Sequence, residues 1–206
     1  MSEPIRKRRT QEERKAESER QIIGAAIKIF ARQGYLRTTL NEVGEEAGYT
    51  GGLVSHRFGS KAGLLKAVIT NIGTRFINDQ IGEALETDTA QEALCNYIAI
   101  YLKEVTVREG HLRALYVIMG EALGGAEDIR KDVAEFNERA RDRIATIIKR
   151  GIGADEFRSD IDPRAAAVLI MGMLRGVVMQ YLFDHKAFNT EKIVPLLQRT
   201  ALGGLK

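Results

Sequence analysis

Apolar residues recur at helical spacing along the chain, and residues 38–61 show the pattern most completely. Thr39 and Glu42 form a capping box, in which each side chain accepts the backbone N–H of the other residue, so a helix is expected to begin there. Gly48 can adopt the left-handed conformation that ends a helix, which keeps this helix short. Its apolar stripe consists of Leu40, Val43 and Ala47.

A second short helix is expected over residues 51–58, with Val54 and Phe58 on its inner face. Its outer face carries only small and polar residues: Gly51, Gly52, Ser55 and His56, with Arg57 at the flank. Two short helices joined by a tight turn are typical of a helix-turn-helix, although a plain helical hairpin is the alternative. A plain hairpin would be expected to carry long charged side chains on this face, whereas a bare face lets a partner approach closely.

The rest of the chain has the same periodicity. One helix is expected over about 17–33, and another, capped by Ser60, runs through Phe76. Further helices are expected from a second capping box at Thr89 and Glu92 to Gly110, and then over about 112–123, 129–150, 163–183 and 191–202. No stretch shows convincing strand alternation, so the predicted fold class is all-α.

These elements predict a three-helix helix-turn-helix domain over residues 17–65 and a helical-bundle domain over residues 66–206. Residues 1–16 contain almost no apolar side chains and are expected to form a flexible basic arm. The densest positive run of the protein lies in this arm and consists of Arg6, Lys7, Arg8 and Arg9. The run either contacts DNA beside the reading helix or is a solvated tail.

The distribution of charge along the chain supports the prediction that the first domain binds nucleic acid. The net charge is +3 overall, but the first 65 residues hold 12 basic against 8 acidic residues, and the remainder is slightly acidic. Positive charge therefore lies with the expected reading helix, as neutralisation of phosphates requires. With 206 residues and 44% hydrophobic content, the chain can also bury a substantial core.

Other protein classes find little support in the sequence. No apolar run approaches a membrane span of about 20 residues, and the longest, 165–173, is followed by Arg175 and is interpreted as a buried helix. The N-terminus has no secretory pattern and Cys95 is the only cysteine, which together favour the cytoplasm. The three histidines are isolated and no nucleophile motif, metal spacing or phosphate-cradling loop is present, so no enzyme, cofactor or metal is expected.

Residues 25–65 resemble the TetR/AcrR family of bacterial transcriptional regulators. The positions that carry the resemblance are Phe30, Gly34, Thr39, Val43, Ala47, Gly48, Gly52, Phe58, Lys61, Leu64 and Leu65. It implies a homodimeric repressor whose two reading helices enter major grooves of a near-palindromic operator, about 34–36 Å apart per helical turn. A small molecule in the second domain would then release the DNA. A dimeric ligand-binding protein without operator-specific DNA binding is the alternative.

When the DNA-binding positions of the family are matched residue by residue to this sequence, the resemblance implies a DNA-binding face. This face consists of Thr39, Thr50, Gly51, Gly52, Leu53, Ser55, His56, Arg57 and Lys61. Ser55 stands where the family commonly has a phosphate-anchoring Tyr, so anchoring is expected to have moved to Arg57 and the basic arm. Arg57 is also the only side chain of this helix that can bind guanine with two hydrogen bonds. Lys61 lies in the first turn of its helix, where the dipole disfavours a cation, and this favours a phosphate contact.

Small residues in the helix over 163–183 allow another helix to approach closely, either in a subunit interface or within one subunit. The first alternative, which the family favours, gives a two-fold four-helix interface. The interface is expected to contain Ala166, Ile170, Gly172, Gly176, Gln180, Ile193 and Leu197.

Large and adaptable side chains on the helices of the second domain are candidates for an effector pocket, although residues at such spacing are usually plain core. The candidates are Phe76, Tyr97, Tyr101, Tyr116, Met119, Phe136, Met171, Arg175 and Met179. They suggest an apolar or aromatic effector. Arg175 is costly to bury unpaired, so it is expected to meet a carboxylate such as Asp184 or Glu121, a neighbouring subunit or an anionic ligand.

Overall fold

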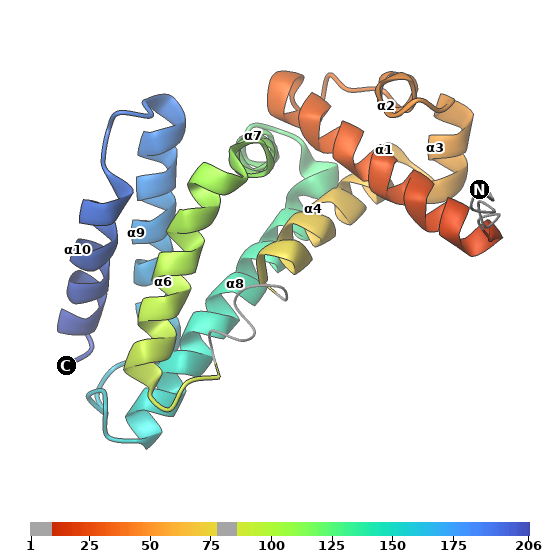
Figure 1. The fold of residues 1–206 in the computed structure, drawn as a ribbon. Helices are drawn as coiled ribbons and strands as arrows, with labels where there is room; N and C mark the ends of the chain where they lie inside the picture. Colours follow the sequence, from red (N-terminus) through yellow and green to blue (C-terminus); the bar gives the residue numbers. More distant parts are fainter. Residues whose placement is uncertain (1–9, 78–85) are drawn as a thin grey trace, which may run out of the picture.

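The computed structural model describes residues 10–77 and 86–206, with residues 74–77 described by their backbone only. Within these ranges every regular element is a helix, so the all-α prediction is confirmed (Figure 1). The helices are α1 Gln11–Gln33, α2 Leu40–Ala47, α3 Gly51–Phe58, α4 Lys61–Ile77, α6 Ala90–Val107, α7 Glu109–Leu123, α8 Glu127–Gly153, α9 Pro163–Phe183 and α10 Thr190–Gly203. Figure 1 shows α1 to α3 at one end and α9 and α10 at the other.

The predicted caps of α2 are present. The Thr39 side chain accepts the Glu42 N–H, and the Glu42 carboxylate accepts the Thr39 N–H at 2.7 Å. This backbone hydrogen bond is the main reason why the pKa of Glu42 is lowered. Gly48 ends the helix in the left-handed conformation, with φ 74° and ψ 26°. The local sequence thus sets both ends of α2.

The start of α1 differs from the prediction. The helix begins at Gln11, with Thr10 as its N-cap and Glu13 completing a capping box, so residues 11–16 are helical rather than part of a flexible arm. The Thr-x-x-Glu spacing was a readable signal for this start. The predicted arm cations Arg6, Lys7, Arg8 and Arg9 lie outside the described residues.

Both ends of α6 add something to the prediction. Thr89 caps α6 as predicted, but the Ala90 and Gln91 N–H groups donate to the carboxylate of Glu156, in the loop after α8, at 2.9 Å each. The break between α6 and α7 falls at Arg108, whose φ is −131° and ψ is 43°, and not at the predicted Gly110.

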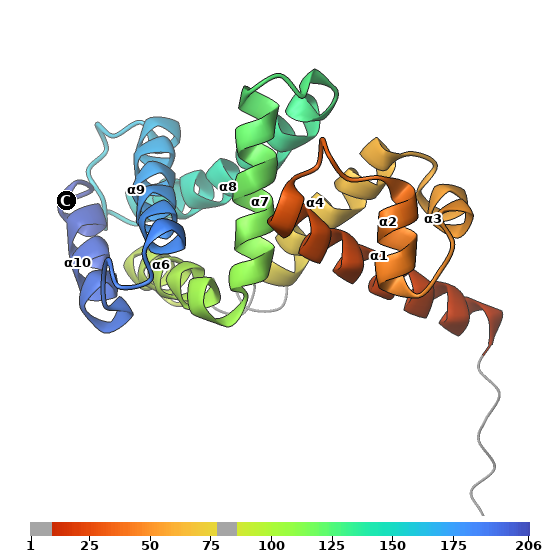
Figure 2. The same cartoon turned by 90° about the horizontal axis from the view of Figure 1, so that it is seen from above.

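Buried side chains form two cores that meet along α7 and α8. The N-terminal core joins α1 to α4 with the C-terminal part of α7 and the first half of α8, and includes Phe30, Val43, Leu64, Ile118 and Val133. The C-terminal core joins α6, α9 and α10 with the second half of α8, and includes Tyr97, Leu102, Ile144, Leu174 and Leu197. Figure 2 shows α7 standing between the two ends of the molecule. The N-terminal core therefore extends well beyond residue 65, the predicted domain boundary.

Within the described ranges, α9 alone is long and apolar enough to cross a membrane. Arg175 interrupts the apolar run, as predicted, but the interpretation of this helix as buried is wrong. Length and composition are weak evidence for a span, because a core helix can satisfy both. Only 28% of the window is buried within this chain. Much of the α9 surface is therefore available to a partner.

Candidate DNA-binding surface and effector cavity

Close contact between α2 and α3 sets the geometry of the helix-turn-helix. A Cβ added to Gly44 would lie 2.7 Å from the Gly51 nitrogen, and one added to Gly51 would overlap the Asn41 side chain and lie 2.9 Å from its Cα. Packing inside the protein therefore accounts for Gly51 without DNA, and its predicted contact with DNA remains a prediction. The glycine inside the α2 pattern, Gly44, was a sequence signal for such a close approach.

The outer face of α3 is formed by Gly52, Ser55 and His56, which are exposed and lie at helical spacing. Thr50 is exposed too, and its hydroxyl caps the helix by accepting the Leu53 N–H at 3.2 Å. Leu53 and Arg57 are half-buried at the edge of this face. The α3 surface is thus small, polar and uncharged at its centre.

Arg57 and Lys61 differ in how they are held. The Arg57 Nε is buried and has no hydrogen-bond acceptor among the described residues. The Lys61 Nζ donates to the carbonyls of Tyr35 and Leu36 at 3.2 and 3.1 Å and lies 4.5 Å from the centre of the Tyr35 ring. These contacts explain Lys61 without DNA, so its predicted phosphate contact remains a prediction.

A cavity lies where the two cores meet and contains about 390 Å³ of empty space, including the part open to solvent. Five of the predicted effector residues line it: Tyr97, Tyr101, Phe136, Met171 and Arg175. Ile72, Leu112, Leu115 and Ala140 complete the lining and were missed, since apolar helical spacing alone does not separate cavity walls from solid core. Ile72, Leu115 and Phe136 belong to the N-terminal core and the other apolar lining residues to the C-terminal core.

The remaining predicted effector residues lie elsewhere. Met179 is 48% exposed and does not line the cavity, which corrects its assignment. Tyr116 donates its hydroxyl hydrogen bond to the Arg175 backbone carbonyl at 3.2 Å, and Met119 packs against the N-terminal core. The side chain of Phe76 lies outside the described residues.

Arg175 has neither of its predicted carboxylate partners. Its guanidinium donates to the Asn137 Oδ1 at 2.7 Å. Glu121 accepts backbone N–H groups of the α1–α2 turn, and Asp184 accepts the Lys186 N–H at 2.9 Å. The expectation of a structural ion pair with Asp184 or Glu121 is therefore wrong.

The Glu121 contact joins the helix-turn-helix to the second domain. This α7 carboxylate accepts the Tyr35 N–H at 2.6 Å and the Leu36 N–H at 3.2 Å. The Tyr35 hydroxyl donates to Asp128 of α8 at 2.8 Å, and burial followed by this hydrogen bond raises the Tyr35 pKa, so the phenol stays protonated. Sequence spacing gives no sign of these contacts, because the partners lie more than 80 residues apart.

The apolar face that α9 leaves exposed includes Val168, Leu169, Met179 and Phe183, of which Leu169 is 70% and Phe183 84% exposed. Gly172, Gly176 and Gln180, predicted for the subunit interface, are exposed as well, whereas Ala166 and Ile193 are half-buried. Ile170 and Leu197 are buried in their own chain, at 3% and 7% exposure, so their assignment to the interface is corrected.

A three-helix module with a small, polar α3 face, joined to a helical domain with an internal cavity, defines a helix-turn-helix DNA-binding regulator. The model of bacterial regulatory proteins of the tetR family matches residues 22–68, and that of the BetI-type transcriptional repressor C-terminal domain matches residues 90–203. The chain belongs to the TetR family of transcriptional regulators.

Relatives cover nearly the whole chain. The HTH-type transcriptional regulator AcrR of Shigella flexneri is 27% identical over 195 residues, which cover 90% of this chain and 87% of that protein. The fatty acid degradation regulator FadR of Bacillus halodurans has a TM-score of 0.81 at 20% identity and covers 97% of this chain and 99% of its own. FadR of Bacillus subtilis, solved in complex with stearoyl-CoA, has a TM-score of 0.79 at 20% identity. The match covers 91% of this chain and 99% of that chain. The relatives are transcriptional regulators, and the structures share the fold.

Proposed function

We propose that the protein is a cytoplasmic homodimeric repressor that binds a near-palindromic operator through α3 and is released by a small molecule in the cavity. The helix-turn-helix domain comprises α1 to α3 and the start of α4, and the rest of the chain forms the effector and dimerisation domain. The position of the cavity carries this proposal. Because its wall combines side chains of both cores, a ligand there displaces helices that pack directly against the DNA-binding module.

α7 provides the physical link. Leu112 and Leu115 of this helix line the cavity, and Glu121, further along, holds the turn between α1 and α2. A helix moves largely as a rigid unit, so a shift at the cavity is transmitted to Glu121. Movement of the α1–α2 turn reorients α3, which changes the spacing of the two reading helices in a dimer. The complex of Bacillus subtilis FadR with stearoyl-CoA supports a small-molecule ligand for this fold.

DNA recognition is proposed to rest on Thr50, Ser55, His56 and Arg57, with the backbone at Gly52 close to phosphates. Arg57→Ala is expected to lower operator affinity by about 1–3 kcal/mol, because the variant loses the one side chain of α3 that can bind guanine with two hydrogen bonds. A titrated gel shift with DNA flanking the gene measures the change, and unchanged affinity would remove Arg57 from the reading surface.

The subunit interface is proposed to form from the exposed apolar face of α9 together with α10. Leu169→Glu is expected to convert the dimer to a monomer, since an unpaired charge buried in an interface costs several kcal/mol, about 3 or more. Light scattering after gel filtration measures the mass. Val107→Glu is the matched control, because Val107 is also an exposed apolar residue, 60% exposed, but lies on α6. A dimeric Leu169→Glu protein would contradict the proposed interface.

A further inference from the structure

The cavity contains a cation that no described carboxylate neutralises. Arg175 lines it from α9, and its one described side-chain partner is the neutral amide of Asn137. The other lining residues are aliphatic side chains and the rings of Phe136, Tyr97 and Tyr101. A guanidinium in such surroundings retains hydrogen-bonding capacity and has lost part of its hydration.

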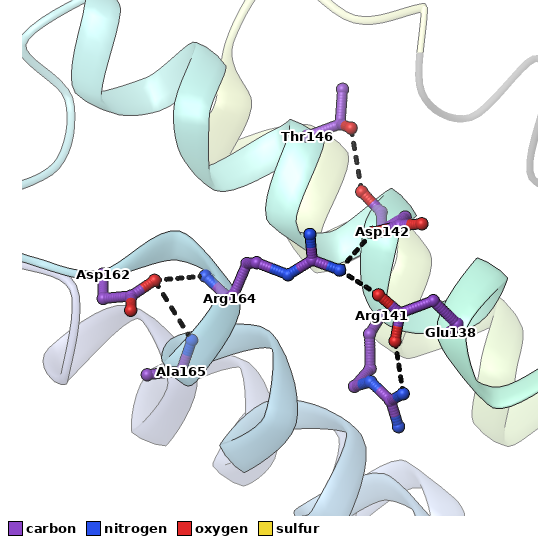
Figure 3. Close-up of polar contacts among 7 residues, drawn as sticks. All are labelled: Glu138, Arg141, Asp142, Thr146, Asp162, Arg164 and Ala165. Carbon is purple, nitrogen blue, oxygen red and sulfur yellow. Dashed lines mark hydrogen bonds and ion pairs between the residues drawn. The ribbon is translucent and has the colours of Figure 1, made fainter. Parts of the chain in front are cut away.

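Two acidic residues of α8, Glu138 and Asp142, are engaged by other arginines. Figure 3 shows the network between α8 and α9, in which the Arg164 guanidinium pairs with Glu138 and lies 3.2 Å from Asp142. Arg141 pairs with the second oxygen of Glu138. This network lies on the surface, and its two carboxylates pair with Arg141 and Arg164. In the described part of the chain, neither carboxylate forms an ion pair with Arg175.

A second guanidinium lies on the same side of α8. Arg143 follows Phe136 and Ala140 at helical spacing, but it lines a separate pocket together with Asp142, Thr146, Ile147 and Arg150 and does not line the cavity itself. Its Nη1 is buried and lacks an acceptor among the described residues, and its pKa is lowered chiefly by burial. A buried donor without an acceptor is costly, so a group that accepts a hydrogen bond and carries negative charge is favoured beside it.

Tyr97 lines the cavity and feels the positive charge of both arginines. Burial raises its pKa, while the positive charges of Arg143 and Arg175 act in the opposite direction. The phenol therefore stays protonated and can donate a hydrogen bond to an anion. The Arg175 guanidinium and the buried Tyr97 hydroxyl, which line one apolar cavity, form a site for an acid group.

We infer that the effector is an apolar molecule with one carboxylate, which Arg175 binds with Tyr97 while Arg143 adds positive potential. This inference rests on the proposed role of the cavity as the effector site. An aliphatic or aryl monocarboxylic acid has the required chemistry.

Three probes of one shape and different charge test the inference: octanoate, octanol and octylamine. Their binding to the full-length protein is measured by titration calorimetry at pH 7. The carboxylate is expected to bind about 10- to 100-fold more tightly than the alcohol, because a hydrogen bond to a charged group contributes more than one to a neutral group. Equal binding of acid and alcohol, or tighter binding of the amine, would overturn the inference.

Substitutions test which residue binds the carboxylate. Arg175→Gln is expected to reduce octanoate affinity about 10-fold or more while leaving octanol binding unchanged. Arg143→Gln should cause a smaller loss, and Arg139→Gln, an exposed position of α8, should cause none. Octanoate binding that is equal in Arg175→Gln and Arg139→Gln contradicts the assignment.

Operator gel shifts with the same probes separate this inference from the proposed function. Release of DNA by octanol as readily as by octanoate contradicts the acid site and leaves the repressor proposal intact. Selective octanoate binding by a protein that does not discriminate operator from unrelated DNA supports the acid site and contradicts the repressor proposal.

Discussion

Gly51→Ala is expected to lower the free energy of unfolding by about 1–3 kcal/mol and to reduce operator binding strongly. The added methyl would overlap the Asn41 side chain and lie 2.9 Å from the Asn41 Cα, so α2 and α3 must separate. The second contact is with backbone, which cannot move aside by a rotamer change. Since the proposed reading of DNA by α3 requires a defined angle between α3 and α2, the change reaches the proposed recognition surface directly. Urea denaturation and gel shifts measure the two effects.

Gly52→Ala is the matched control. Apart from adjacent residues and the backbone of its own helix, a Cβ there would have Thr50 Oγ1 as its nearest neighbour at 3.8 Å, an ordinary contact distance. Alanine in a helix is favoured over glycine by up to about 1 kcal/mol, so this variant should be at least as stable as the wild type. Equal stability of the two variants would contradict the packing role of Gly51. A stable Gly52→Ala protein with weakened operator binding would show that DNA approaches the backbone here.

Glu121→Ala is expected to lower the free energy of unfolding by about 2–3 kcal/mol, because it removes two charge-assisted hydrogen bonds to the α1–α2 turn. The same carboxylate joins the DNA-binding module to α7, so its loss should also weaken the coupling between the two cores. Calorimetric unfolding is then expected to change from one transition to two.

Glu135→Ala on α8 is the control, since Glu135 is exposed and the substitution removes the same charge. Its unfolding should match that of the wild type. If Glu121→Ala also unfolds in a single transition at the wild-type temperature, Glu121 does not join the two cores.

Features with local causes could be predicted from the sequence. The ends of α2, α3 and α9 follow from Thr39, Thr50 and Asp162 as caps and from glycines or Pro163 at fixed offsets. The start of α1 at Gln11, with Thr10 as its N-cap, carried the same kind of signal, but the basic composition of the segment suggested a flexible tail.

Features with tertiary causes could not be predicted in the same way. α9 is apolar on all sides, so periodicity does not show which face is inside, and Ile170 was placed on the wrong side. The partners of Arg175 and Glu121 come from helices distant in sequence. The sequence shows that position 51 has no side chain. Whether this absence makes room for DNA or for Asn41 depends on the angle and distance between α2 and α3, which the sequence does not give.

The most direct test of the account is a footprint of the purified protein on DNA flanking its own gene, with unrelated competitor DNA in excess. We expect protection of one near-palindromic site with two symmetric halves, about 34–36 Å or a multiple of this distance apart. Protection should disappear when the effector is added. Uniform protection that unrelated DNA removes as readily as the flanking sequence does would contradict operator-specific regulation by this protein.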